Sequence, residues 1–434
     1  MAPEGAPSLS VRQAAFIGVG AMVGAGIFAL LGAAGEVAGS AVWISFLAAG
    51  GVAALQGYSF AKLGARYPSG GGFLEYVIRG WGDGHLTGVI GWLLLAVNAI
   101  ITAMVAASFG NYASAAVADN DHWTPLFAAL VLIVMTTLNI VGSQAVARVQ
   151  TLVVVVVIGI LTVFSVATIS NLDPDLLRFS GYPPVSDIVS SVALTFFAFL
   201  GFGVITFTAK DLADPRRQLP KAVFLALGIA TVVYVAVAIG VFGTLTVSEV
   251  IASGGTALAV AAKPVLGSAG YWMMSVTALF ATAGATNAGL YPATGLAGQM
   301  AEVGQFPPLM GRLVGGRASM GLLVTAVSAV IMAVFFDLNA IASIGSAVAL
   351  VVFALVTWGH IRIRGETGAR LPMLILAELT TGVVLVAFTF TTLVHEPGTA
   401  VALVAILLLS LILDLGWKRR RDSERGSEPG SSLD

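Results

Sequence analysis

Two glycine-interrupted apolar segments are the residues of this chain best suited to hold a polar ligand inside a membrane. The first is Gly24-Ala25-Gly26, near the N-terminus, and the second is Leu200-Gly201-Phe202-Gly203, near the middle of the chain. They lie at matching places in two successive groups of five apolar runs. Glycine weakens a helix interior by about 1 kcal/mol relative to alanine, so each segment is a place where a helix can be interrupted. Paired interruptions of this kind indicate a ligand site at the membrane midplane.

The first glycine segment offers backbone dipoles to a ligand with two charges. If the helix unwinds over residues 22 to 26, free amides at the start of the outer half, near Gly26, face a carboxylate. The last carbonyls of the inner half, around Met22, then face an ammonium group, and an α-amino acid carries both charges. The same glycines also fit a seam for close helix packing, because Gly20 and Gly24 have the Gly-x-x-x-Gly spacing. Both interpretations remain open at this point.

Composition places the whole chain in a lipid bilayer. Of its 434 residues, 58% are hydrophobic and only 10% are charged, and the mean hydropathy is +0.96. This leaves too little polar surface for a water-soluble protein of this length. Crossing roughly 30 Å of hydrocarbon takes about 17 to 25 helical residues. Runs of this kind predict an all-α polytopic membrane protein with twelve spans, over residues 13–34, 41–61, 86–116, 124–141, 149–170, 188–209, 222–245, 271–298, 320–336, 340–361, 372–394 and 399–413.

The positions of the basic residues predict the orientation of these spans. Lysine and arginine near span ends are retained on the cytoplasmic side of a cell membrane. With twelve spans and a cytoplasmic N-terminus, every basic residue except Arg178 and Lys263 falls on that side. Losing or adding one span would destroy this separation for all later loops. We therefore expect a multi-pass protein of the cytoplasmic membrane with both termini in the cytoplasm.

The sequence argues against several other classes of function. The formal net charge of -1 disfavours nucleic-acid binding. The absence of cysteine excludes disulfides and thiolate metal sites, and the four histidines lie in loops or at span ends. We therefore do not expect an enzyme, and we expect neither a bound metal nor a cofactor. The basic run 418–421 is interpreted as a stop for the last span and a contact for anionic lipid, and residues 418–434 as a disordered cytoplasmic tail.

Four motifs resemble those of the amino acid, polyamine and organocation (APC) permeases. They are Gly24 to Phe28, the stretch Phe196 to Phe202 followed by Asp214 to Pro220, Tyr67 to Gly72, and Ala301 to Pro307. The motifs are spread over roughly the first 310 residues. The resemblance implies an amino acid permease with a five-plus-five inverted repeat, in which helices 1 and 6 are broken, and two additional helices.

Applied to this chain, that organisation predicts five regions. They are a cytoplasmic N-terminus (1–12), a first five-helix repeat (13–170), a second (187–363), two additional transmembrane helices (371–417) and the tail (418–434). The links 62–85 and 246–270 fall at equivalent positions of the two repeats. Each link is long enough for a short helix that does not cross the membrane.

The resemblance also implies a substrate site on the two broken helices. The carboxylate would be held by the amides of Gly24, Ala25 and Gly26, and the amine by the carbonyls of Met22, Phe197 and Leu200. Next to Gly201, either Phe197 or Phe202 would act as a gate. Side chains from the third, eighth and tenth spans would complete the pocket, and the candidates are Asn98, Met104, Asn287 and Ser343.

The coupling ion is left open by the sequence. Some proton-coupled members of the resembled family carry a lysine in the fifth span, where this chain has Val157. Glu378 is the only carboxylate well inside a span, and it is either a proton site or a side chain that reaches the interface or an arginine there. Thr282 and Thr286 could face sodium, or could bond to the carbonyl one turn earlier.

These observations predict a secondary-active transporter that moves amino acids by alternating access. No acidic residue lies in spans 1, 3, 6, 8 or 10, which disfavours basic substrates and favours small apolar or neutral amino acids. The expected partners are the amino acid, membrane lipid and a possible coupling proton or sodium ion. The alternatives are an amino acid exchanger (antiporter) and a ligand-binding membrane sensor with the same fold.

Overall fold

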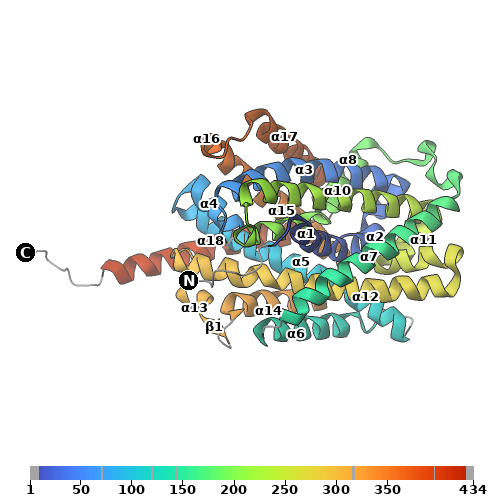
Figure 1. Ribbon diagram of the computed structural model, residues 1–434, viewed down its shortest axis with the longest axis horizontal. Helices are drawn as coiled ribbons and strands as arrows, with labels where there is room; N and C mark the ends of the chain where they lie inside the picture. The colour runs from blue at the N-terminus through green and yellow to red at the C-terminus, as the bar shows by residue number, and fades with distance from the viewer. Residues whose placement is uncertain are drawn as a thin grey trace, which may run out of the picture.

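The computed structural model describes residues 9–69, 72–118, 121–141, 144–314, 318–394 and 396–426 of the chain. These residues are almost entirely helical, and the helices pack side by side in one elongated bundle (Figure 1). Within the described part, the strands β1 (Leu313–Val314) and β2 (Ala318–Ser319) form a short antiparallel pair in which Leu313 is opposite Ser319. An all-α fold is thus confirmed.

The helices differ widely in length. The first half of the chain contains α1 (Val11–Ala25), α2 (Ile27–Ala38), α3 (Val42–Arg66), α4 (Phe73–Trp81), α5 (His85–Ala118), α6 (Thr124–Val141) and α7 (Gln144–Ser170). The second half contains α8 (Val185–Phe197), α9 (Val204–Phe207), α10 (Pro215–Phe242), α11 (Val247–Ser253), α12 (Ala257–Glu302), α13 (Pro308–Gly311), α14 (Met320–Phe335), α15 (Leu338–Arg362), α16 (Arg364–Thr367), α17 (Leu371–Phe388) and α18 (Pro397–Gly426). Short 3-10 turns are η1 (Gly39–Ala41), η2 (Pro174–Leu177), η3 (Phe179–Gly181), η4 (Leu200–Gly203), η5 (Ala209–Asp211) and η6 (Gly254–Thr256), and η7 (Thr389–Leu393) is a π-helical turn.

Length and composition identify the helices that can cross a membrane. Among the described residues, nine helical stretches qualify, or ten if the bent pair formed by α8 and η4–α9 is one span. One of the nine is a 40-residue stretch, Ile27–Arg66, that contains both α2 and α3. Two shorter apolar helices, Val11–Gly24 and Met320–Phe335, lie where the first and ninth spans are predicted. The chain is therefore a polytopic membrane protein, and the count of twelve stays a prediction.

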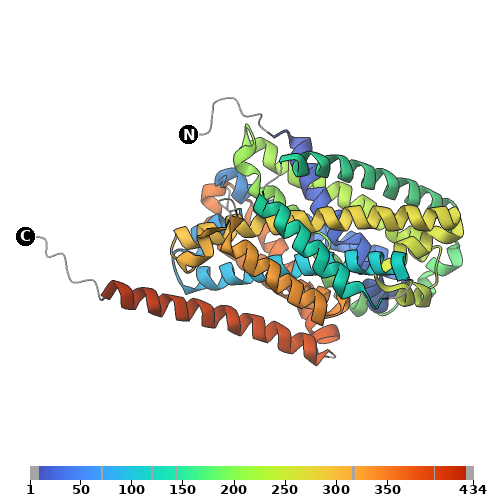
Figure 2. The ribbon, with the colours of Figure 1, turned by 90° about the horizontal axis from the view of Figure 1, so that it is seen from below.

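The two ends of the bundle carry different short elements. One end, which we call the termini end, is where α1 begins and α18 ends (Figures 1 and 2). The short helix α4 lies at this end, whereas α11 lies at the opposite end (Figure 1). Both occupy the links that the sequence reserves for helices that do not cross the membrane. The start of α11 is fixed by a capping box, in which Thr246 and Glu249 bond to each other's backbone amides.

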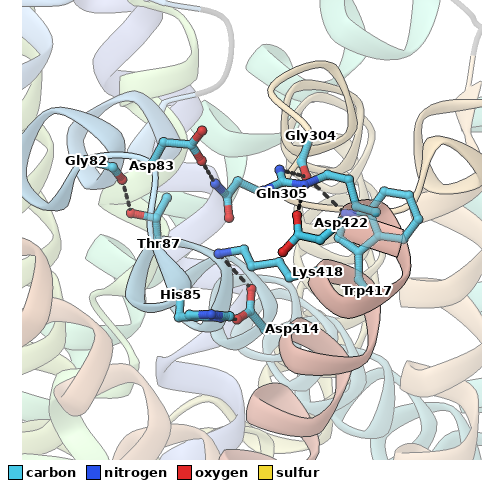
Figure 3. Close-up of polar contacts among 11 residues, drawn as sticks. Gly82, Asp83, His85, Thr87, Gly304, Gln305, Asp414, Trp417, Lys418 and Asp422 are labelled. Carbon is cyan, nitrogen blue, oxygen red and sulfur yellow. Dashed lines mark hydrogen bonds and ion pairs between the residues drawn. The ribbon is translucent and has the colours of Figure 1, made fainter. Parts of the chain in front are cut away.

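The last helix is anchored to the termini end by buried polar contacts (Figure 3). The fully buried carboxylate of Asp414 lies 2.6 Å from Nδ1 of His85 at the start of α5, and 3.3 Å from Nζ of Lys418. The indole of Trp417 donates a 2.9 Å hydrogen bond to the carbonyl of Gly304, which follows α12. These contacts join α18 to the start of α5 and to the end of α12.

This anchoring corrects two predictions for the C-terminal region. The helix α18 continues to Gly426, so the first residues of the predicted tail, 418–434, are helical, and those after Gly426 lie outside the described residues. Two residues of the basic run 418–421 contact protein groups, whereas the sequence predicts a contact with anionic lipid. Lys418 is buried against Asp414, and Arg421 donates a 2.9 Å hydrogen bond to the carbonyl of Gly304. The reason is the spacing of four residues, which places Asp414 and Lys418 on one helix face.

Candidate functional site

The first predicted break is present, but it is limited to one residue. The helix α1 continues through Ala25, and α2 begins at Ile27. At Gly26 the backbone angles are φ -98° and ψ -70°, and its amide still bonds the carbonyl of Met22 at 2.9 Å. The amides of Ala29 and Leu30 both reach the Gly26 carbonyl, at 3.3 and 3.0 Å. The interruption is thus narrower than the expected segment of residues 22 to 26.

Gly24 serves helix packing, the second of the two open interpretations. A Cβ atom at Gly24 would lie 2.4 Å from the carbonyl oxygen of Ala281 and 2.4 Å from Cβ of Ala285, both in α12. Only a residue without a side chain lets the two helices approach this closely. The glycine run of α1 therefore combines a packing seam at Gly24 with an interruption at Gly26.

The second break is wider and bends the chain. The helix α8 and the segment Leu200–Phe207 are bent by 40° relative to each other. In the bend, the amides of Ala198 and Phe199 bond to carbonyls three residues earlier, at 3.1 and 2.9 Å, instead of four as in an α-helix. The hydroxyl of Tyr234 in α10 donates a 3.1 Å hydrogen bond to the Ala198 carbonyl. A side chain of a neighbouring helix thus satisfies a carbonyl that the interruption leaves without its helical partner.

The two breaks lie directly against each other. A Cβ atom at Gly26 would lie 2.4 Å from Cβ of Ala198. A Cβ atom at Gly201 would lie 2.5 Å from the amide nitrogen of Met22 and 2.6 Å from the carbonyl carbon of Ala21. Any side chain would clash at both positions, with the Ala198 Cβ and Cα atoms at Gly26 and with the backbone of α1 at Gly201. Segments 175 residues apart in the sequence therefore form one junction near the middle of the bundle.

A small cavity of about 60 Å³ adjoins this junction on the side of the termini end. Ala21 of α1 and Leu200, Gly201 and Gly203 of η4 line it, together with residues of α5, α12 and α15. Asn98 of α5 supplies the only amide side chain in the lining, and its buried Nδ2 has no hydrogen-bond partner among the described residues. An unpaired buried donor is costly, so this atom is suited to a polar ligand.

Aromatic side chains form the wall of the cavity nearest to the termini end. Phe73 of α4 and Phe353 of α15 line the cavity, and their ring centroids are 5.9 Å apart. The ring centroid of Phe60 lies 4.6 Å from that of Phe73 and 4.8 Å from that of Phe353. Phe202, one of the two predicted gate residues, packs edge-on against Phe353 at 5.6 Å. The cluster joins α3, α4 and α15 to the second break.

The other predicted gate residue, Phe197, is not among the residues that line the cavity. Its side chain is buried and packs between helices, since a Cβ atom at Gly345 of α15 would lie 2.2 Å from its ring. Ile100 of α5 approaches the same point at 2.7 Å. Phe197 therefore closes the space between α5 and α15 beside the bend.

The predicted pocket side chains are only partly brought together. Asn98 lines the cavity, but Asn287 accepts a 2.8 Å hydrogen bond from Asn139 of α6. Met104 and Ser343 are buried and are not among the residues that line the cavity. The lining face of α12 consists instead of Ala285, Gly289, Pro292 and Leu296. Their spacing of four, three and four residues is the helical signal that the sequence analysis missed.

The coupling candidates occupy three different environments. Thr282 and Thr286 donate to the carbonyls of Ala278 and Thr282, at 2.7 and 2.8 Å, which is the bonding to the preceding turn. Val157 lies beside Gly20 and Gly24 of α1, so the position next to the first helix is apolar. Glu378 has a buried Oε1 without a hydrogen-bond partner among the described residues. None of these residues lines the cavity.

Comparison with known proteins decides the family. The model of the family described as "Amino acid permease" matches residues 9–412, which includes both breaks and every residue that lines the cavity. The chain belongs to this amino acid permease family. It is a transporter rather than an enzyme, and a multi-pass protein of the cell membrane.

Individual relatives agree with this assignment. The permease is 33% identical over 421 residues to an inner membrane transport protein of Escherichia coli, YbaT, and the match covers 96% of this chain and 98% of that protein. It is 26% identical to cationic amino acid transporter 3 of Arabidopsis thaliana, over 81% of this chain and 61% of that protein. A methylthioribose transporter of Bacillus subtilis is 27% identical over 55% of this chain and 56% of its own length.

Proposed function

We propose that this permease moves a small neutral or apolar amino acid across the membrane by alternating access, and that it binds the amino acid at the junction of the two breaks. One observation carries the proposal. Two interrupted helices meet at their glycines beside a cavity lined by Asn98, whose buried Nδ2 has no hydrogen-bond partner among the described residues. A zwitterion supplies partners for both kinds of backbone group that an interruption exposes.

The carboxylate is assigned to the start of α2. The helix begins at Ile27, and no side chain caps it at Gly26. An uncapped helix start presents free amides and a partial positive charge to an anion. Because the amide of Gly26 already bonds the Met22 carbonyl and Gly24 packs against α12, we assign this site to the amides of Ile27 and Phe28 at the start of α2.

The ammonium group is assigned to carbonyls of the second break. The candidates are Phe197 and Leu200, which flank the bend. The carbonyl of Met22 is a weaker candidate, because it already accepts the amide of Gly26 at 2.9 Å. Asn98 faces the same cavity and is placed to contact either the substrate backbone or a small polar side chain.

The substrate class follows from the cavity walls. The lining contains no carboxylate and no cation, and most of it is apolar or aromatic. A carboxylate would be needed to neutralise a basic side chain, so lysine and arginine are disfavoured. The volume of about 60 Å³ also favours a small side chain. The cationic amino acid transporter and the methylthioribose transporter among the relatives are the competing substrate classes.

The architecture proposed for alternating access has twelve spans in two inverted repeats of five, followed by two further helices. Three pairs of elements support it. Broken α1–α2 corresponds to broken α8–α9, α3 corresponds to α10, and the short helix α4 corresponds to α11. In an inverted repeat, the members of such a pair belong at opposite ends of the bundle, and α4 and α11 do lie at opposite ends (Figure 1).

The proposal is tested by thermal unfolding of the purified permease with each of the twenty L-amino acids. A ligand that binds only the folded state raises the melting temperature. We expect a shift with small neutral or apolar amino acids and none with lysine or arginine. Counterflow of the best ligand in proteoliposomes then separates transport from binding alone. Shifts limited to basic amino acids would contradict the substrate class, and binding without counterflow would indicate a sensor.

A further inference from the structure

A second pocket lies at the termini end, away from the substrate cavity. It has a volume of about 590 Å³ and is lined by the end of α3, the start of α10 and the loop that contains α16. Lys62, Arg66 and Arg216 line it together with a single carboxylate, Glu366. None of these residues contributes to the cavity at the two breaks. The pocket therefore needs a separate explanation.

Two of the three cations are free to bind an anion. Within the described part of the chain, Lys62 and Arg216 take part in no ion pair. Lys62 lies over the ring of Tyr58, with Nζ 6.0 Å from the ring centroid. Arg66 uses its Nε to donate a 3.2 Å hydrogen bond to the backbone carbonyl of Glu366. Its guanidinium carbon lies 5.5 Å from the centroid of the Tyr67 ring, so Arg66 is more constrained than the other two cations.

The one carboxylate in the pocket is already engaged. The phenol of Tyr67, directly after α3, donates a hydrogen bond to the Glu366 carboxylate. Burial, and then this hydrogen bond, raises the pKa of Tyr67 above its ordinary value, so the phenol keeps its proton for the contact. Among the described residues, Glu366 forms an ion pair with neither Lys62 nor Arg216, and its single negative charge leaves the three cations of the lining in excess.

The position of the pocket along α10 indicates a membrane interface. The first turns of α10 carry Arg216, Arg217 and Lys221, and from Ala222 onward the helix is apolar. Phe224 lines the pocket at this change and is 42% exposed. Leu225, beside it, is also 42% exposed, as expected for a side chain that faces lipid tails. The cations thus lie at headgroup depth, and an apolar wall continues toward the hydrocarbon.

We propose that this pocket binds the headgroup of an anionic phospholipid, with its phosphate between Lys62 and Arg216 and an acyl chain against Phe224. Basic pockets between membrane helices are suited to such headgroups. The pocket joins α3 and α10, the two helices that pack along each other beside the breaks. It also includes the loop before α17, so a bound lipid would connect the repeated core to the additional helices.

The test compares lipids on the purified full-length permease in nanodiscs and by native mass spectrometry. The probes are phosphatidylglycerol and phosphatidylcholine, with inorganic phosphate and soluble glycerol 3-phosphate as headgroup controls. We expect retention of phosphatidylglycerol over phosphatidylcholine. Each basic side chain near the membrane contributes a factor of about five, so Lys62→Gln/Arg216→Gln should weaken phosphatidylglycerol binding about twenty-five-fold.

A matched variant removes the same charge outside the pocket. Arg217→Gln/Lys221→Gln changes two exposed cations of the same helix that do not line the pocket, and it should retain binding. The melting temperature of both variants in phosphatidylcholine nanodiscs checks folding. If both double variants lose phosphatidylglycerol binding equally, the binding depends on general surface charge and the proposed site is wrong. Equally tight binding of inorganic phosphate would overturn the assignment to a lipid.

Discussion

At the scale of single residues, Asn98 is the side chain that most directly distinguishes a ligand cavity from a packing defect. Asn98 lines the cavity, and its buried Nδ2 has no hydrogen-bond partner among the described residues. A hydrogen bond to a charged ligand group contributes about 1.5 kcal/mol or more, so Asn98→Leu should weaken amino acid binding about tenfold or more. Isothermal titration with the amino acid selected by thermal unfolding measures this.

The control for Asn98→Leu is a pair of asparagines elsewhere in the membrane helices, Asn139 and Asn287. Asn139 donates to Asn287 at 2.8 Å, away from the cavity. Replacing both partners removes the hydrogen bond without leaving one group unpaired, so Asn139→Leu/Asn287→Leu should keep the ligand affinity. A tenfold loss in this double variant, or none in Asn98→Leu, would place the polar contact of the substrate elsewhere.

Glu378 tests whether a carboxylate inside an apolar helix is a coupling group. The residue lies on α17, which packs on α3, α8 and α15 and does not line the cavity. We therefore expect Glu378→Gln to transport within about twofold of the wild type and to keep any stimulation by an imposed proton gradient. Uptake into proteoliposomes with proton and sodium gradients measures both. Loss of the proton response alone would instead assign coupling to Glu378.

At the scale of elements, Gly26 at the break between α1 and α2 is closely packed, whereas Gly159 in α7 has open space beside it. A Cβ atom at Gly26 meets Ala198 at 2.4 Å, whereas a Cβ atom at Gly159 of α7 has no atom within 4 Å. Gly26→Leu should therefore abolish amino acid binding, and Gly159→Leu should leave it within about threefold, since its side chain enters open space. Scintillation proximity binding measures both variants.

Protein quality has to be checked for this pair. Gly26→Leu must elute as a single species and unfold cooperatively for its loss of binding to count. If it does not, Gly26→Ala, with one added methyl group, replaces it in the comparison. Equal binding losses at Gly26 and Gly159 would mean that the glycines of these helices only serve packing.

The elements themselves were largely predictable, and their contacts were not. Apolar runs and motifs located both breaks, because glycine at mid-helix is a local signal. The helix packs closely at Gly24 because of a contact with Ala281, which is more than 250 residues away in the sequence. No local sequence pattern indicates such a contact. In the same way, the face that α12 turns to the cavity is Ala285 and Gly289, while Asn287 points to α6. Asn287 lies in the predicted span, but the sequence alone does not show how that helix is rotated about its axis. The rotation decides which of its residues face the cavity.

At the scale of the whole molecule, the end of α18 shows a limit of composition as a guide. Residues 418 to 426 are polar and were expected to be disordered, yet they continue the helix. Buried contacts of Asp414 with His85 and Lys418 hold this end of the helix in place. The contact with His85 joins residues far apart in the sequence, and it stabilises a segment that its own composition would leave unfolded.

The orientation proposed for the whole bundle can be measured in this chain without background, because it contains no cysteine. Ser423→Cys probes the end of α18, and Ser248→Cys probes α11, and both positions are exposed. With both termini in the cytoplasm, a membrane-impermeant maleimide should label Ser248→Cys in intact cells and Ser423→Cys only after lysis. The reverse pattern would invert the orientation, and labelling of both in intact cells would contradict the opposite placement of the two ends.

We propose that the amino acid binds where the break between α1 and α2 meets the break between α8 and α9. Amide hydrogen exchange of the unmodified permease, with and without a saturating amino acid, tests it most directly, because bound backbone amides exchange more slowly. We predict protection in peptides that cover residues 20–31 and 196–204, and unchanged exchange in residues 151–170. Protection confined to other segments, with both breaks unchanged by a ligand that binds, would contradict the account.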